Sequence, residues 1–202
     1  MTKFLFATTN QGKARELKQA FSDQGIAAEI LTNGDLTNPP KVAETGATFE
    51  ENAKLKAQAL ADYSGLITIS DDSGLMVDYL NGEPGVRSAR YAGDHDDTAN
   101  NAKLLANLGG VPENKRSAVF KTVIVVARPN QPEKDLVVSG ECRGRIGIMP
   151  QGDDGFGYDP LFFVPEKGKT FAEMTTSEKN SISHRGRAIA KLLQELPAWL
   201  EE

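Results

Sequence analysis

Apolar residues are distributed along this chain in two spacings, one typical of strands and one typical of helices. Short runs rich in β-branched and aromatic side chains predict strands, because these side chains fit a pleated, partly buried surface. The predicted strands span residues 3–7, 26–32, 66–70, 118–127 and 136–145. The last two flank a proline-containing loop and are expected to form a β-hairpin.

Helices are predicted where apolar residues recur every three or four positions, since that spacing puts them on one face. The first follows Lys13, and the second follows a capping box made by Thr48 and Glu51. A third covers residues 98–108, and the last is expected to end at Pro197. Strands that alternate with helices predict an α/β fold.

The composition is that of an ordinary soluble protein with one domain, residues 1–202. Hydrophobic residues make up 39% of the chain and charged residues 25%. The net charge of −5 argues against a general nucleic-acid or membrane-surface binder. It does not exclude an anionic ligand, because a few local basic groups and a metal ion can outweigh the global sign.

Cysteine usage and hydropathy predict a cytoplasmic protein. Cys142 is the only cysteine, so the chain has no internal disulfide framework. No apolar run approaches the length of a membrane span, and Met1 to Ala7 lack the apolar core of a signal peptide.

Two adjacent carboxylates, Asp71 and Asp72, follow the β-branched run at residues 66–70. Ser73 and Gly74 favour turns, so the strand is expected to have ended before them. Ligands of open α/β sheets bind beyond the carboxyl ends of strands, which makes this a candidate site. Taken alone, the same residues are equally consistent with an acidic turn of no chemical consequence.

A small polar loop, residues 8–13, connects the first strand to the first helix. This layout directs backbone N–H groups and a helix N-terminus at an anion, and Lys13 adds a positive charge. A plain N-capped helix start has the same appearance. Glu44 lies in a loop where no helix needs it, whereas Lys54 and Lys56 are interpreted as solvated charges on the second helix.

The last third of the chain holds a second polar cluster. Phe156 lies between two glycines, so its ring has an open face suited to stacking against a flat ligand, although a tight turn with an exposed ring fits as well. Lys179, His184 and Arg185 are expected at or before the start of the final helix, where cations oppose the helix dipole. Such a placement suggests a bound polyanion, or ordinary surface charges.

Together these segments resemble the inosine/xanthosine triphosphate pyrophosphatases, which hydrolyse deaminated purine nucleoside triphosphates. The resemblance covers residues 8 to 186, with its motifs in the family's order: residues 8–13, 44–53, 70–75, 85–93, 155–160 and 183–186. Thr9 departs from the family, in which many members carry glycine there. The resemblance implies a long mixed β-sheet flanked by helices, with two lobes and a central cleft, a homodimer and a requirement for Mg²⁺.

The resemblance also implies roles for individual residues. Glu44 and Asp72 would bind Mg²⁺, and Asp72 would act as the general base. Ser73 would donate a hydrogen bond to the ligand, and Phe156 would stack on the purine. The remaining substrate-binding residues would be Thr8, Thr9, Asn10, Gln11, Gly12, Lys13, Gly157, Tyr158, Asp159, Lys179, His184 and Arg185.

Two other classes of protein share part of this pattern. A non-catalytic nucleotide-binding module needs the loop, the aromatic ring and the basic residues, but not Glu44 together with Asp72. A metal-dependent phosphatase of another substrate class needs the carboxylates but gains nothing from a purine-stacking Phe156.

Overall fold

A computed structural model describes residues 2–201 of the chain, and in this range the strands form one seven-stranded sheet. The strand order is β2-β1-β3-β4-β5-β6-β7. The strands are β1 (Thr2–Phe6), β2 (Ala28–Thr32), β3 (Ile67–Val77), β4 (Ser117–Ala127), β5 (Leu136–Ile146), β6 (Phe162–Val164) and β7 (Lys169–Thr170). β1 pairs in parallel with β2 and β3, whereas β6 pairs antiparallel with β5 and β7. The predicted mixed α/β sheet is therefore confirmed.

Five α-helices accompany these strands in the described part of the chain. They are α1 (Gln11–Asp23), α2 (Phe49–Ser64), α3 (Asp97–Asn107), α4 (Thr176–Ile182) and α5 (His184–Glu201). The predicted capping box of the second helix is present in part: the Thr48 side chain accepts a hydrogen bond from the Glu51 backbone N–H. None of the helices within residues 2–201 combines the length and apolarity needed to cross a membrane.

The chain divides into two compact units. Unit 1 comprises the residues up to Asp72, residues 123–139 and the residues from 188 on; unit 2 comprises residues 73–122 and 140–187. The boundary passes through β3, β4, β5 and α5, so each of these elements contributes residues to both units.

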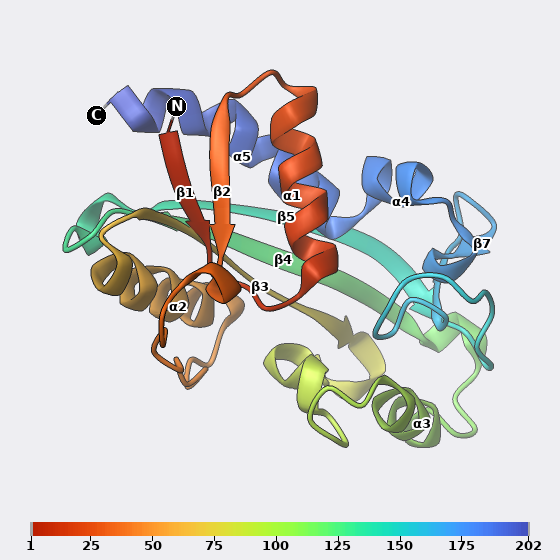
Figure 1. Ribbon diagram of the computed structural model, residues 1–202. Helices are drawn as coiled ribbons and strands as arrows, with labels where there is room; N and C mark the ends of the chain where they lie inside the picture. Colours follow the sequence, from red (N-terminus) through yellow and green to blue (C-terminus); the bar gives the residue numbers. More distant parts are fainter. Residues whose placement is uncertain (1, 202) are drawn as a thin grey trace. The chain divides into compact units, whose positions relative to one another are not determined.

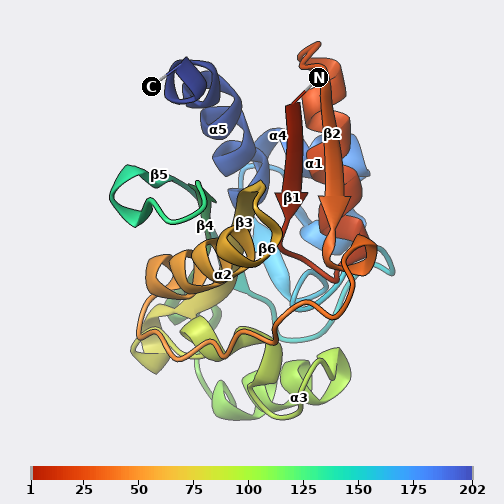
Figure 2. The ribbon, with the colours of Figure 1, turned by 60° about the vertical axis from the view of Figure 1, so that its left-hand side comes forward.

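Unit 1 has helices on both faces of its strands. Phe4 and Phe6 of β1 pack in one cluster with residues of α1 and α5. Leu5 and Ala7 point the other way and pack with Leu60 of α2. This follows from the alternation of side chains along a strand. β1 and β2 lie side by side with α1 alongside them (Figures 1 and 2).

Unit 2 has a separate apolar core built largely from aromatic side chains. The rings of Phe162 and Phe171 lie 4.8 Å apart between centroids, and that of Phe120 lies 4.7 Å from Phe162. Tyr158 and Leu161 are buried in the same cluster. Both ring pairs are tilted, and close aromatic contacts stabilise a core beyond the area that they bury.

The expectation that the third strand ends before Asp71 is wrong, because β3 continues without interruption to Val77. β3 has a neighbouring strand on each side, β1 and β4. β1 pairs with β3 only at residues 67–69, so beyond them β4 is the neighbouring strand that keeps the backbone extended. Strand propensity depends strongly on context, and here it outweighs the turn preference of Ser73 and Gly74. Asp71 and Asp72 are thus residues of a central strand rather than of a turn.

The expected end of the last helix at Pro197 is also wrong, because α5 continues to Glu201 with Pro197 inside it. A proline in a helix removes one hydrogen bond and crowds the preceding turn. Trp199 offsets this cost: its ring is buried in the unit 1 core, and its Nε1 donates to the backbone oxygen of Lys134 at 2.6 Å.

Candidate functional site

In unit 1 the loop of residues 8–13 forms the start of α1. Asn10 is the N-cap, and its Oδ1 accepts hydrogen bonds from the backbone N–H groups of Gly12 (2.8 Å) and Lys13 (3.1 Å). The Asn10 N–H donates in turn to Thr8 Oγ1. An anion that used the Gly12 and Lys13 N–H groups would have to displace the Asn10 side chain.

Asp71 and Asp72 are consecutive but contact different helices. Asp71 Oδ2 lies 2.8 Å from Nζ of Lys13 on α1. Asp72 Oδ2 accepts a hydrogen bond from Nδ2 of Asn52 on α2, at 3.1 Å. Because α1 and α2 cover opposite faces of the unit 1 strands, the extended conformation of β3 separates the two carboxylates. They do not act as one bidentate pair.

Lys56 brings the Glu44 loop together with β3. Its Nζ lies 2.8 Å from Glu44 Oε1, 2.7 Å from the backbone oxygen of Asp71 and 3.7 Å from Asp72 Oδ1. The interpretation of Lys56 as a solvated charge is therefore wrong, since its side chain is only 17% exposed. Lys54 is 44% exposed and pairs with Glu50 one turn away on the same helix, as a surface charge does.

The surroundings of Asp72 in this cluster bring the pKa of its carboxyl group close to neutral pH. Burial raises the pKa of Asp72 to about 6; Glu44 and Asp71 act in the same direction, and Lys56 and Asn52 oppose them. For Lys56, burial favours the neutral form, but the surrounding carboxylates outweigh it and raise the pKa above its ordinary value. The cluster thus combines a fixed ammonium group with a carboxylate able to take up a proton near pH 6.

The donor set fits a hard divalent cation such as Mg²⁺. On the α2 side of β3 the carboxylates of Glu44 and Asp72 share one lysine, Lys56, so negative charge is in excess there. Among residues 2–201 no group of three or more Asp, Glu, His or Cys side chains is arranged to hold a metal ion by itself. Mg²⁺ commonly uses only one or two carboxylates and takes its other ligands from phosphates and water.

In unit 2 the loop around Phe156 is fixed from several directions. Asp159 Oδ2 accepts a hydrogen bond from the Phe156 N–H at 2.9 Å, while Asp97 and Asn101 of α3 bind the N–H and the carbonyl oxygen of Gly157. Phe156 as a whole residue is 39% exposed, in agreement with the predicted exposed aromatic residue.

Lys179 faces this aromatic loop from α4. Its Nζ lies 2.6 Å from Asp159 Oδ2 and 4.8 Å from the centroid of the Phe156 ring. As predicted, Lys179 lies before the start of the final helix, α5. It belongs, however, to the last turn of a separate short helix, α4, where a cation is favourable rather than opposed to the helix dipole. Tyr158 has its ring in the core, and its hydroxyl donates to the backbone oxygen of Ser88.

His184 and Arg185 begin α5 and are both buried. The His184 ring stacks on Phe120 at 4.7 Å, and Arg185 Nη2 lies 3.3 Å from Ser73 Oγ. The next residue, Gly186, lets α4 and α5 approach closely: a Cβ there would lie 1.8 Å from the backbone oxygen of Asn180. The requirement for glycine at position 186 was not predicted from the sequence.

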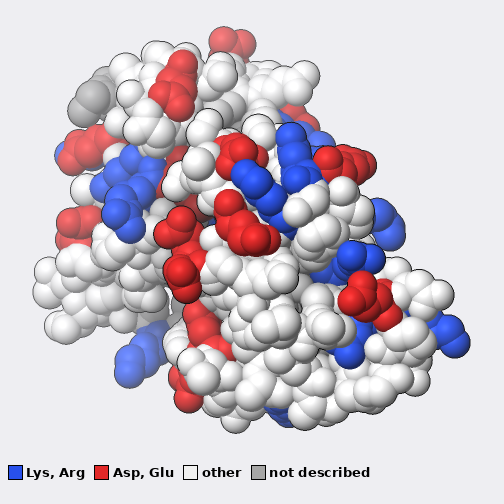
Figure 3. Space-filling view, turned by 90° about the vertical axis from the view of Figure 1, so that its right-hand side faces the viewer, with Lys and Arg blue, Asp and Glu red and all other residues white. Residues whose placement is uncertain are grey.

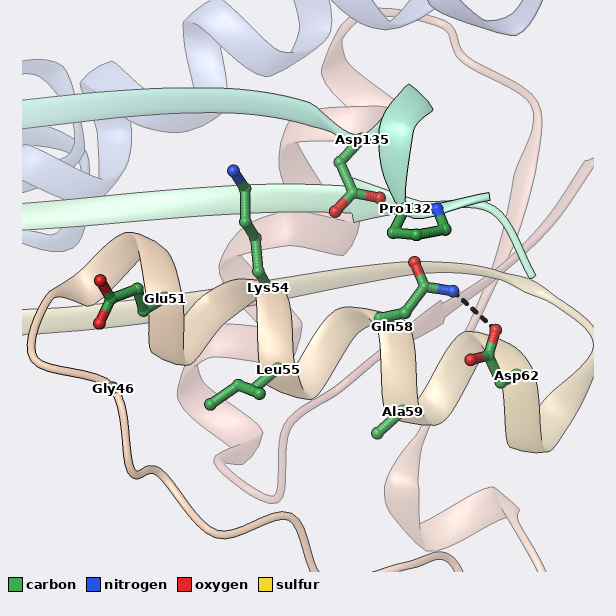
Figure 4. A pocket seen from close by; sticks show the side chains of 9 residues that line it. All are labelled: Gly46, Glu51, Lys54, Leu55, Gln58, Ala59, Asp62, Pro132 and Asp135. Atoms are coloured by element: carbon green, nitrogen blue, oxygen red, sulfur yellow. Dashed lines mark hydrogen bonds between the residues drawn. The ribbon is translucent and has the colours of Figure 1, made fainter. Parts of the chain in front are cut away.

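A groove of about 650 Å³ lies along α2, and none of the predicted catalytic or substrate-binding residues lines it (Figure 4). Neither Asn52 nor Lys56 is among its α2 residues. The lining residues are Gly46, Glu51, Lys54, Leu55, Gln58, Ala59, Asp62, Pro132 and Asp135.

Comparison with known proteins gives a consistent result over nearly the whole chain. The model of the Ham1 family matches residues 4–195. A dITP/XTP pyrophosphatase from Lactobacillus acidophilus is 69% identical over 197 residues, covering 97% of this chain and 98% of that protein. Another from Lactobacillus johnsonii is 60% identical over 200 residues, covering 98% and 97%. The structure of a HAM1 protein from Coxiella burnetii superposes with a TM-score of 0.91 at 37% identity, covering 98% of this chain and 100% of that one.

Proposed function

This chain belongs to the Ham1 family, and from that membership we propose that it hydrolyses non-standard purine nucleoside triphosphates, namely ITP, dITP and XTP. The products are the nucleoside monophosphate and pyrophosphate, so the reaction removes deaminated purines from the nucleotide pool. The curated relatives described above, at 69% and 60% identity, carry the name dITP/XTP pyrophosphatase.

The observation that carries the chemistry is the environment of Asp72. In the metal-free protein the buried Asp72 carboxylate, with a pKa of about 6, is largely ionised at neutral pH and basic enough to accept a proton from water. In the proposed reaction the water oxygen attacks phosphorus, its proton passes to Asp72, and the bond between the α- and β-phosphates breaks. Pyrophosphate then leaves with the electron pair of that bond.

Mg²⁺ is the proposed cofactor, with Glu44 and Asp72 as its protein ligands. The ion would neutralise phosphate charge and make a bound water more acidic. Lys56 would keep the Glu44 loop against β3 while the metal ion and the nucleotide bind. Lys13 would supply the positive charge of the phosphate-binding loop, together with Thr8, Thr9, Asn10, Gln11 and Gly12.

Recognition of the purine is assigned to the aromatic loop of unit 2. Phe156 would stack on the base through its exposed ring. Lys179 offers only hydrogen-bond donors, so it suits the C6 oxygen of hypoxanthine and xanthine rather than the amino group of adenine. His184 and Arg185 would meet the polar edge of the base or the phosphates, and Ser73 would donate a hydrogen bond to the ligand.

The proposed partners are the nucleotide and a second copy of the chain in a homodimer, with no nucleic acid and no membrane. On the face drawn in Figure 3, Lys and Arg side chains are interspersed with Asp and Glu rather than gathered into a continuous basic area. Together with the net charge of −5, this supports a small nucleotide as substrate rather than a nucleic-acid backbone.

Product analysis tests the proposed function. The purified protein is incubated with ITP and Mg²⁺, then with EDTA in place of the metal. Pyrophosphate and IMP that form only with the metal are the expected result. Orthophosphate would instead support a phosphatase, and tight binding without turnover would support a nucleotide-binding module.

A further inference from the structure

Asn52 is a fully buried amide that bonds to two separate parts of the candidate metal site. Its side chain has 0% exposure. Its Nδ2 donates to Asp72 Oδ2 at 3.1 Å, and its Oδ1 accepts from the backbone N–H of Gly46 at 2.8 Å. Gly46 is two residues after Glu44 in a loop that has no regular secondary structure. One side chain therefore joins the loop of one proposed metal ligand to the carboxylate of the other.

Close packing supports this connection. A Cβ on Gly46 would lie 2.7 Å from Asn52 Oδ1 and 2.6 Å from the Cβ of Glu51, distances that real Cβ atoms essentially never show. Glycine therefore allows the loop to approach α2 closely enough for its N–H to reach Asn52. Because the amide is excluded from solvent, water cannot take the place of a lost hydrogen bond, and each group that loses its partner stays unpaired.

The chemistry of the link is specific to an amide. The connection needs one donor, for the carboxylate, and one acceptor, for the N–H, on the same short side chain. An aspartate would present only acceptors and would set a second charge against Asp72. A leucine of similar size would offer neither group.

We propose that Asn52 is a positioning residue, which fixes the distance between Glu44 and Asp72 and so presets the spacing of the two metal-binding carboxylates. This rests on the metal role assigned to both residues in the proposed function. Outer partners of this kind orient the ligands of a metal, and their loss typically costs about 10–100-fold in metal affinity.

The test measures metal binding directly and does not depend on substrate. Mn²⁺ alone is titrated into metal-free protein and followed by electron paramagnetic resonance. The variants are Asn52→Leu, which removes both hydrogen bonds, Gly46→Ala, which displaces the loop but leaves the Asn52–Asp72 bond, and the pair together. Glu51→Gln is the matched control, because Glu51 Oε2 accepts from the Ala47 N–H of the same loop without contacting Asp72.

We expect Asn52→Leu and Gly46→Ala each to raise the Mn²⁺ dissociation constant about tenfold or more, and Glu51→Gln to change it less than twofold. The double variant should bind Mn²⁺ no more weakly than Asn52→Leu does, because the two substitutions break the same connection. If Asn52→Leu does not fold, Gly46→Ala carries the test by itself. An unchanged Mn²⁺ affinity in folded Asn52→Leu, or in folded Gly46→Ala, would overturn the inference.

A second readout separates this inference from the proposed function. With ITP as substrate, the half-saturating Mg²⁺ concentration of Asn52→Leu should rise about tenfold, while kcat at saturating Mg²⁺ falls far less than in Asp72→Asn. If the wild-type protein hydrolyses ITP and the Mg²⁺ titration of Asn52→Leu matches that of the wild type, only the role of Asn52 is refuted. The proposed function then stands. A wild-type protein that binds no Mn²⁺ would remove the metal role of both carboxylates and this inference with it.

Discussion

The Nζ atom of Lys56 lies 2.8 Å from Oε1 of Glu44, although the two residues are 12 positions apart and Glu44 belongs to an irregular loop. The same ammonium group donates to the backbone oxygen of Asp71. A lysine on α2 therefore ties the loop to the central strand of unit 1. Through Lys56 the Glu44 loop, α2 and β3 come together in one cluster.

Replacing Lys56 by Met should therefore lower both activity and stability. The apolar stem is retained, but the carboxylates of Glu44 and Asp72 lose the charge that compensates them. Removing one partner of a buried pair costs about 3–5 kcal/mol, and about half of that is expected here because Glu44 is partly exposed. Lys54→Met is the control: its surface pair contributes no more than about 0.5 kcal/mol. Denaturant unfolding curves and ITP turnover measure the two effects, and equal losses in both variants would contradict this role of Lys56.

Asp72→Asn should abolish most turnover and also change how stability depends on pH. Turnover should fall at least about 100-fold, the scale of a lost general base. The pKa of Asp72 is raised from its ordinary 3.8 to about 6, mainly by burial. Its contribution to the stability of the metal-free protein is therefore fully present below pH 3.8 and is lost as the pH rises through 6.

The asparagine does not titrate, so the variant should lack this loss, on the order of 1–3 kcal/mol between pH 4 and pH 8. Thermal unfolding of both proteins in EDTA across that range measures the difference. Parallel stability profiles would show that Asp72 is not the group with the raised pKa. Near-normal turnover in the folded variant would remove Asp72 as the base.

Lys179→Met should reduce selectivity between bases. Lysine can satisfy the C6 oxygen of inosine but leaves the amino group of adenosine facing a second donor. Loss of that discrimination should shrink the ITP-over-ATP ratio of kcat/KM, since sites built around a hydrogen bond reject analogues that lack it. A ratio that stays at its wild-type value while both rates fall together would assign Lys179 to the phosphates instead. Stability must be compared as well, because Asp159 loses its ion pair.

Gly186→Ala should destabilise the protein and disturb the start of α5. Its Cβ would lie 1.8 Å from the backbone oxygen of Asn180, so α4 and α5 must separate. Overpacking of this kind costs about 1–3 kcal/mol or more. Gly34→Ala is the matched control, since its Cβ would meet only Thr32 Oγ1 at an ordinary 3.7 Å. Equal melting temperatures for the two variants would argue against the close helix contact.

The chain should form a homodimer in solution. Light scattering at micromolar concentration should give a mass twice the single-chain value of 21.8 kDa. A mass equal to that of one chain, unchanged on tenfold concentration, would contradict the dimer.

The hydrophobic pattern by itself determined most of the secondary structure. The strands and helices of unit 1 lie close to where periodicity predicted them, because a strand or helix must present its apolar side chains on one face to reach a core. β6, β7 and α4 were not predicted. They are short, and the apolar residues in such short segments are too few to define a period.

Only the tertiary structure decided which polar side chains meet. The order of motifs identified Asp72, Glu44 and Phe156 as candidates, whereas Lys56 was interpreted as a solvated charge and Asn52 was not singled out. They lie one turn apart on α2, a spacing that indicates a shared face but not what the face contacts. That contact depends on the position of β3 under α2 and on the extended backbone at Asp71 and Asp72. Pairing with strands distant in sequence fixes that backbone, and local residue preferences do not encode it.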